Sequence, residues 1–454
     1  MVFLSNSMPF FKDVYHRIVK RDFSGNTGLA IKNSMYLFST GFVAKMGSLV
    51  FTIILARLLM PELFGLYSLA LSTILVFGAI SELGISQTLV RYVSKFLGKN
   101  NNKKAKAYVL YLGKIKGTLV IVSIFLLIIA SKFISENYYQ KPLFLALIAG
   151  AFYIIAVNVI SFFSVILQSS NNFKNYFFQE FFFQISRIIL VPLAVLYALK
   201  AYLSSELTIF YIIIAISVSY IPSIFYLWKS IKDKSLFMKS EAFAIPARER
   251  KETNRFIFAI SSIILSGVFF ANIDKIMLGR FVSTEFIGYY TASFSLIGAL
   301  VVLAGFNAVL LPIFSRIKGK KLELALGKSL KIISLFSLLL FFAVAIFSPL
   351  IISIIYGPEY RLSVNILRLL SILLLLLPAA GVYTAYLTAI NKPQIISKLL
   401  IASTLINIAL NYILITSFLK FGEIMAVYGA VFATLISQAF YLAGLFVAKK
   451  RESQ

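Results

Sequence analysis

Twelve apolar segments, each long enough to cross a lipid bilayer, dominate this chain of 454 residues. A bilayer core of about 30 Å requires about 20 consecutive apolar residues in a helix. Lipid offers the backbone no hydrogen-bond partners, so such a segment satisfies its own amides and carbonyls as a helix. The predicted spans are 33–59, 66–90, 107–131, 143–168, 177–199, 208–228, 256–281, 286–312, 326–355, 362–388, 394–418 and 425–447. We therefore expect an all-α integral membrane protein of the cell membrane with twelve transmembrane helices.

The composition fits this interpretation and excludes several others. Hydrophobic residues make up 60% of the chain and its mean hydropathy is +0.90, far from the values of a soluble domain. The net charge of +27 does not indicate nucleic-acid binding, because the basic residues lie in loops between the apolar segments. Cysteine is absent, which excludes disulfides, thiolate metal sites and thiol nucleophiles.

The distribution of basic residues over the loops predicts the orientation. Residues 91–106, 229–255, 316–331 and 449–454 each carry several lysines or arginines, whereas the intervening loops carry one or two. The positive-inside rule then places both termini in the cytoplasm. The expected domains are a cytoplasmic amphipathic N-terminal segment at 1–32, a six-helix bundle at 33–228, a basic cytoplasmic linker at 229–255, a second six-helix bundle at 256–448 and a cytoplasmic tail at 449–454.

Residues 10–23 have the pattern of a basic amphipathic helix within the N-terminal segment. Apolar residues fall on one face and Lys12, Arg17 and Lys20 fall on the other. Such a helix lies either along the anionic surface of the cytoplasmic leaflet or against the cytoplasmic loops of the protein.

One segment of the chain occurs twice. Residues 53–67 (IILARLLMPELFGLY) align without a gap on residues 276–290 (IMLGRFVSTEFIGYY), at an offset of 223 residues that is close to half of the chain. The shared residues that carry this alignment are Arg57/Arg280, Glu62/Glu285, Gly65/Gly288 and Tyr67/Tyr290. With six spans each, both halves start on the same side, so the repeat is parallel, with its axis along the membrane normal. Many secondary transporters are built from such repeats, with the substrate site between them.

The repeated segment is predicted to lie at the outer ends of the first and seventh helices. There the two glycines would permit a tight turn, and Tyr67 and Tyr290 suit the aromatic belt of a membrane protein. We interpret the motif as a turn that sets the first hairpin of each half. Alternatively, Arg57 and Arg280 line an outer vestibule.

Ionisable residues inside the spans are costly and mark candidate functional sites. Lys45 lies near the middle of the first span on a face of small and polar residues, which indicates either a water-filled cavity or a structural ion pair with an acid. Arg187 lies in the middle of the fifth span, and its spacing from Glu180 places both on one face. Glu180 either neutralises Arg187 or leaves it facing a cavity.

Three further ionisable residues complete the candidate substrate-binding set. Glu82 lies deep in the second span and either lines the cavity or pairs with Lys45. Asp274 and Lys275 lie in the outer third of the seventh span. Lys275 is long enough to reach the interface, whereas Asp274 is too short to do so.

Several classes of chemistry have no residues to support them. The single histidine, His16, lies outside the spans, so no histidine-based metal site or catalytic triad is expected. The chain has no glycine-rich nucleotide loop of the GxxxxGK type. We expect a protein that is not an enzyme and needs no cofactor. Transport would then be driven by Na⁺, H⁺, the membrane potential or the substrate's own concentration difference.

Three stretches resemble a known family. They are LARLLMPELFGLYSLALS, ELGISQTLVRYVSKFLGKNN and IDKIMLGRFVSTEFIGYYTASFSL, and the short piece LTAINKP at 387–393 adds to them. Together with the helix count, they make the chain similar to the Wzx-type polysaccharide flippases of the multidrug/oligosaccharidyl-lipid/polysaccharide exporter superfamily. The resemblance implies two six-helix bundles, as in the multidrug (MATE) branch, around a central cavity.

The resemblance also implies a function and partners. Such flippases move polyprenyl-diphosphate-linked oligosaccharides from the cytoplasmic to the outer leaflet by alternating access, beside glycan polymerases or transferases. Lys45 and Arg187 in a low-dielectric cavity suit a diphosphate, because charge-assisted hydrogen bonds are strong there. A multidrug cation/ion antiporter is the main alternative, although Lys45 and Arg187 count against it. A membrane glycan-assembly scaffold or glycosyltransferase is a third, and the sequence lacks the large extramembrane loop that such an enzyme usually has.

Overall fold

A computed structural model describes residues 24–232, 245–304 and 307–452, and the predicted helix at 10–23 lies outside these ranges. The described residues are almost entirely helical and contain no strand, which confirms the all-α prediction. The elements of the first half are α2 (Gly25–Glu82), α3 (Ile85–Leu97), α4 (Asn102–Lys132), η2 (Phe133–Tyr139), α5 (Phe144–Ser169), α6 (Phe173–Lys200), α7 (Ser205–Val218) and α8 (Ile221–Lys232). Those of the second half are α9 (Ala247–Phe281), α10 (Thr284–Ala304), α11 (Asn307–Phe314), α12 (Lys320–Ile355), η3 (Pro358–Tyr360), α13 (Ser363–Leu370), α14 (Leu373–Ala389), α15 (Pro393–Leu419) and α16 (Glu423–Glu452).

Helix α2 contains the first predicted span and most of the second, divided by a sharp break. Met60 has φ 57° and ψ 171°, outside the helical region, and Pro61 follows it. Proline has no amide hydrogen, and its ring disfavours the helical conformation of the preceding residue. The predicted turn of this hairpin is therefore a one-residue break at Met60, before Gly65 is reached.

Ten stretches are long and apolar enough to cross a membrane within the described ranges. One of them, Ile31–Leu97, has 67 residues. A continuous helix of that length would be about 100 Å long, about three times the hydrocarbon thickness, so the break at Met60 divides it. The eighth predicted span, 286–312, falls on α10 and α11, which lie on either side of residues 305–306. The count of twelve and the cytoplasmic position of both termini stay predictions.

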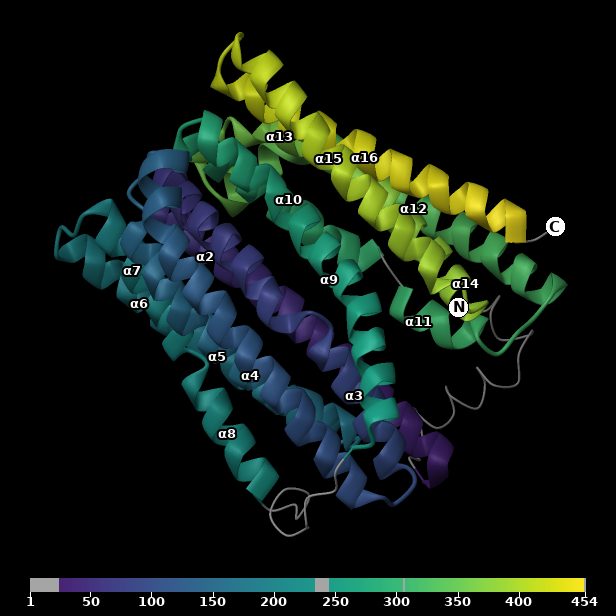
Figure 1. The fold of residues 1–454 in the computed structure, drawn as a ribbon. Coiled ribbons are helices and arrows are strands. Elements are labelled where there is room, and N and C mark those ends of the chain that lie inside the picture. The colour runs from purple at the N-terminus through teal and green to yellow at the C-terminus, as the bar shows by residue number, and fades with distance from the viewer. Residues whose placement is uncertain (1–23, 233–244, 305–306, 453–454) are drawn as a thin grey trace.

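Apart from α9, whose N-terminal part contacts α3 and α4 of the first half, the two halves meet at one end and diverge toward the other (Figure 1). Along the meeting edge, the part of α2 that follows Met60 packs against α10, and α9 contacts both α2 of the first half and α15 of the second. The main hydrophobic core runs through this contact, since it contains Leu66 and Leu69 of α2 together with Ile287 and Leu296 of α10. The halves therefore share a core at this end, which we call the junction.

Candidate functional site

Arg187 on α6 lies between two aromatic rings. Its guanidinium carbon is 4.3 Å from the ring centroid of Phe51 on α2 and 5.0 Å from that of Phe183 on α6. A cation over an aromatic face is stabilised by the ring quadrupole, most strongly where water is excluded. The apolar surroundings thus hold the charge of Arg187 in place without a direct carboxylate partner.

Gln184 joins Arg187 to the neighbouring acid and to α2. It accepts a hydrogen bond from Arg187 Nη2 at 2.6 Å and donates from Nε2 to Glu180 Oε1 at 2.6 Å. Gly47 permits this contact with α2, because a Cβ there would lie 2.7 Å from Gln184 Oε1. The predicted neutralisation of Arg187 by Glu180 is therefore indirect. The Arg187 Nε atom is buried without a hydrogen-bond partner, so this cluster retains an unused cationic donor.

Lys45 lies on α2 and directly follows Ala44, which contacts the arginine cluster formed by Glu180, Gln184 and Arg187. The Ala44 carbonyl accepts a long hydrogen bond from Gln184 Nε2 at 3.5 Å. The Lys45 side chain is exposed, and none of the hydrogen bonds or ion pairs among the described residues involves it. The two cations predicted to share a site therefore lie on helices that pack against each other.

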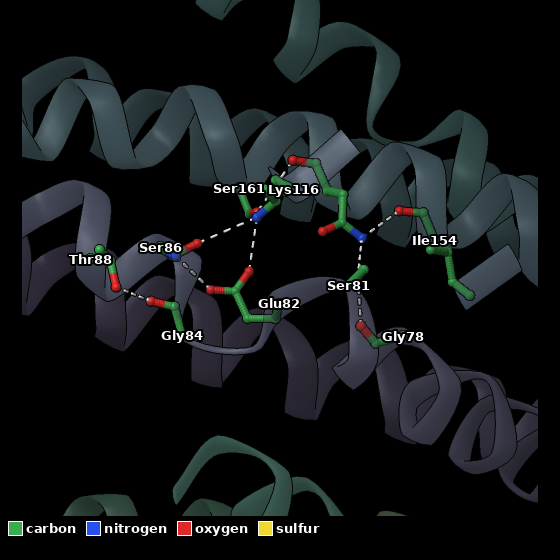
Figure 2. Close-up of polar contacts among 10 residues, drawn as sticks. Gly78, Ser81, Glu82, Gly84, Ser86, Thr88, Lys116, Ile154 and Ser161 are labelled. Carbon is green, nitrogen blue, oxygen red and sulfur yellow. Dashed lines mark hydrogen bonds and ion pairs between the residues drawn. The ribbon is translucent and has the colours of Figure 1, made fainter. Parts of the chain in front are cut away.

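Glu82 pairs with Lys116 of α4, so the alternative pairing with Lys45 is wrong (Figure 2). Lys116 Nζ lies 2.8 Å from Glu82 Oε2 and also donates to Ser161 Oγ at 2.6 Å. The other carboxylate oxygen of Glu82 accepts the Ser86 amide at 3.1 Å, at the start of α3. This amide has no intrahelical partner, and the helix dipole favours a negative charge there. Sequence reasoning overlooked Lys116, although a lysine inside the span 107–131 was the available signal.

We expect Lys116→Ala to lower the free energy of unfolding by about 3 kcal/mol, the lower end of the range for a broken buried ion pair. Lys116 is buried, but the Glu82 side chain keeps 24% of its exposure, which moderates the cost. Thermal unfolding in detergent measures the effect. Lys114→Ala, an exposed lysine on the same helix, is the matched control. Equal melting temperatures for the two variants would contradict the structural role of the pair.

Asp274 lies inside the second half, surrounded by hydroxyl and amide groups. Its Oδ2 accepts hydrogen bonds from Tyr290 of α10 and Thr434 of α16, both at 2.5 Å. Its Oδ1 accepts one from Asn411 Nδ2 of α15 at 2.7 Å. Lys275, by contrast, donates to Asn272 on its own helix at 3.3 Å. Asp274 is buried, so it faces the interior of this half.

We call Asp274 and the polar side chains around it the acid cluster, and two more polar atoms belong to it. The side-chain oxygens of Asn407 and Asn411 are buried without a hydrogen-bond partner. The Asn407 amide nitrogen donates to Ser437 at 3.2 Å, on the neighbouring helix α16. A carboxylate, two amide oxygens and nearby hydroxyls form an oxygen-rich set of the kind that hard cations prefer. Sequence reasoning found Asp274 but missed the asparagines, whose spacing of four residues in an apolar span was the available signal.

The repeated motif lies at the junction, and its structure corrects two interpretations. Gly65 and Gly288 make no turn, since both lie within helices where α2 and α10 cross. A Cβ on Gly65 would lie 1.7 Å from the Thr284 carbonyl oxygen, and one on Gly288 would lie 2.1 Å from that of Pro61. Tyr67 and Tyr290 are buried in the core, so they form no aromatic belt. Arg57 and Arg280 have exposed side chains that donate to backbone carbonyls of the opposite half.

Comparison with known families identifies this architecture. Residues 30–318 match the family described as polysaccharide biosynthesis protein. Because the match covers more than half of the chain, the protein belongs to that family, as its resemblance to the polysaccharide flippases implied.

Two membrane proteins are among the relatives that are similar to the chain. An uncharacterized membrane protein of Methanocaldococcus jannaschii is 23% identical over 82% of this chain and 74% of its own length. A probable low-salt glycan biosynthesis flippase of Haloferax volcanii is 24% identical over 43% of this chain and 42% of its own.

The structural likeness extends over most of the chain. An inward-facing multidrug resistance MATE family transporter of the MOP superfamily has a TM-score of 0.68 at 15% identity, covering 90% of this chain and 96% of that one. The lipid II flippase MurJ has a TM-score of 0.65 at 17% identity, covering 92% and 87%. These likenesses confirm the expected multi-helix membrane fold.

Proposed function

We propose that this protein is a flippase, rather than an enzyme, that moves a polyprenyl-diphosphate-linked oligosaccharide from the cytoplasmic to the outer leaflet. The carrying observation is the arginine cluster, in which Arg187 has a buried Nε atom without a partner. The planar fork of a guanidinium can bind two oxygens of a phosphate group at once, and a diphosphate supplies such oxygens. The polysaccharide biosynthesis family and the similarity to a probable glycan biosynthesis flippase of Haloferax volcanii support a glycan as the transported group.

Lys45 adds a second cation to the proposed headgroup site. Its exposed side chain extends from the helix that packs against α6. Because a lysine is a flexible point charge, it can follow the phosphates as the two halves rearrange. The apolar tail would stay in the bilayer, so the protein needs to shield only the headgroup.

We propose that the acid cluster couples this transport to a cation, either Na⁺ or H⁺. Asp274 would carry the ion, and the unpaired oxygens of Asn407 and Asn411 would complete the coordination of Na⁺ or accept a hydrogen bond from a protonated carboxyl. The cluster joins α9, α10, α15 and α16, so occupancy would change the packing of the second half. Coupling-ion sites in secondary transporters lie among such helices.

A binding experiment tests the headgroup assignment. We expect a fluorescent glycan-diphosphate lipid to bind the purified protein in detergent, and inorganic pyrophosphate to compete for the site. The same lipid with the diphosphate replaced by a neutral linker should bind at least about tenfold more weakly, because a charge-assisted contact contributes 1.5–3 kcal/mol. Equal binding of the charged and neutral lipids would contradict the assignment.

A further inference from the structure

The arginines of the repeated motif make the same contact in opposite directions. Arg57 of the first half donates from Nε to the Ile355 carbonyl at 2.7 Å and from Nη2 to the Ile354 carbonyl, at the end of α12 in the second half. Arg280 of the second half donates from Nη1 to the Asn137 and Tyr138 carbonyls at 3.0 and 2.7 Å, at the end of η2 in the first half. Each arginine thus binds the end of the helix that forms the third predicted span of the other half.

A second pair of contacts follows the same symmetry. The Tyr360 hydroxyl of the second half donates to the Ala56 carbonyl at 2.8 Å, and Lys141 Nζ of the first half donates to the Gly279 carbonyl at 2.7 Å. Ala56 and Gly279 directly precede the two arginines. Burial lowers the pKa of Lys141 below its usual value. The Glu423 carboxylate raises this pKa, and the Arg280 cation lowers it further. Each half thus supplies two side chains that donate hydrogen bonds to backbone carbonyls of the other half. The crossing of α2 and α10 at Gly65 and Gly288 lies at the same junction.

The electrostatics of helix ends explain why arginine occupies these positions. The last carbonyls of a helix have no intrahelical partner and carry the negative end of its dipole. Gly357 (φ 101°) and Gln140 (φ 55°) end the two helices in the left-handed region and turn the chain away. A guanidinium has several donors in one plane and can bind two successive carbonyls. Because the acceptors are backbone atoms, the contact does not depend on the side chains of the opposite helix.

We propose that Arg57 and Arg280 form a reciprocal latch that favours the conformation in which the two halves are joined at the junction. For a headgroup to leave on the side of the membrane where the junction lies, the two halves must separate at the junction. The hydrogen bonds of Arg57 and of Arg280 to the helix ends must then break together. The arginine side chains are exposed, so water can replace the carbonyls and the contacts are individually modest. The latch therefore biases the conformational equilibrium and still permits it to reverse. The proposal explains why the two halves share these residues.

The latch can be tested without substrate or transport, so the result is independent of the proposed function. Tyr202 and Phe421 are exposed residues in loops of the first and second half. Because the chain has no native cysteine, Tyr202→Cys and Phe421→Cys allow spin labels to be attached at these two positions only. Pulsed electron paramagnetic resonance in lipid nanodiscs then measures the ratio of long to short distances between the halves.

We expect Arg57→Ala and Arg280→Ala each to raise that ratio about two- to fivefold, and the double variant about five- to twentyfold, from the strength of charges at helix ends. Arg361→Ala is the control, because Arg361 is also exposed near this end and its side chain makes no hydrogen bond within the described part of the chain. An unchanged ratio in a folded double variant would overturn the latch. If the double variant does not fold, the same distance measurement is made on Tyr360→Phe and Arg57→Lys. We expect each of them to raise the ratio of long to short distances about twofold, and an unchanged ratio in both would overturn the latch.

Discussion

Arg187→Ala should lower outward transfer of a glycan-diphosphate lipid about ten- to a hundredfold while the protein still inserts and folds. Truncating one partner of a buried charged contact costs about 2–5 kcal/mol, and each 1.4 kcal/mol is about tenfold in affinity. Because Arg187 is only partly buried, we expect a cost around the low end of that range, about 1.4–2.8 kcal/mol, which corresponds to a ten- to a hundredfold loss. Initial rates of transfer in proteoliposomes, at a lipid concentration below saturation, measure the loss.

Matched variants separate the charge of Arg187 from its packing. Arg187→Lys should retain part of the activity, since it keeps the charge and loses the planar donors. Lys45→Ala should lower transfer, and Lys45→Arg should be milder for the same reason. Lys200→Ala, an exposed lysine at the end of the same helix α6, should transfer lipid at the native rate. Full complementation of a flippase-deficient strain by both Arg187→Ala and Lys45→Ala would contradict the proposed headgroup site.

Asp274→Asn should remove the dependence of transfer on an imposed Na⁺ or H⁺ gradient without abolishing lipid binding. Asparagine has nearly the same shape and can still accept hydrogen bonds from Tyr290 and Thr434, but it has no charge to bind a cation. We expect transfer with the gradient to fall to the rate measured without it, a decrease of about tenfold or more if coupling contributes at least 1.4 kcal/mol.

Glu285→Gln is the matched control for the acid cluster. Glu285 also accepts a hydrogen bond from a tyrosine of α10, Tyr289, but it lies outside the cluster. We expect this variant to respond to the gradient as the native protein does. A native protein whose transfer is indifferent to Na⁺, H⁺ and membrane potential would leave the flippase assignment standing and remove the coupling role from Asp274.

The fold could be predicted from sequence because it depends on long-range averages. Apolar segments of sufficient length form helices whatever their neighbours are, and the repeated segment predicts that the chain has two related halves. The break at Met60 was misplaced because the glycine at position 65 was a stronger turn signal than the proline at 61. A glycine in a membrane helix also permits close packing with another helix, and sequence alone does not distinguish these two uses.

The candidate sites were only half predictable, for a physical reason. A single charged residue in an apolar span shows that a polar environment exists, but its partners come from helices far away in the sequence. Asp274 was identified in this way, whereas Asn411 lies 137 residues further on. Lys116 was missed and Glu82 was given the wrong alternative partner. The repeated arginines were noticed, but their acceptors are backbone carbonyls, which leave no trace in residue identity.

Parallel transport assays in proteoliposomes test the central claim most directly. One assay follows outward transfer of a fluorescent glycan-diphosphate lipid, and the other follows efflux of a lipophilic cation dye, as a multidrug antiporter would perform. The proposed function predicts lipid transfer that falls in Arg187→Ala, with dye efflux at the level of empty liposomes. Dye efflux without lipid transfer would contradict the flippase assignment and favour a multidrug cation/ion antiporter.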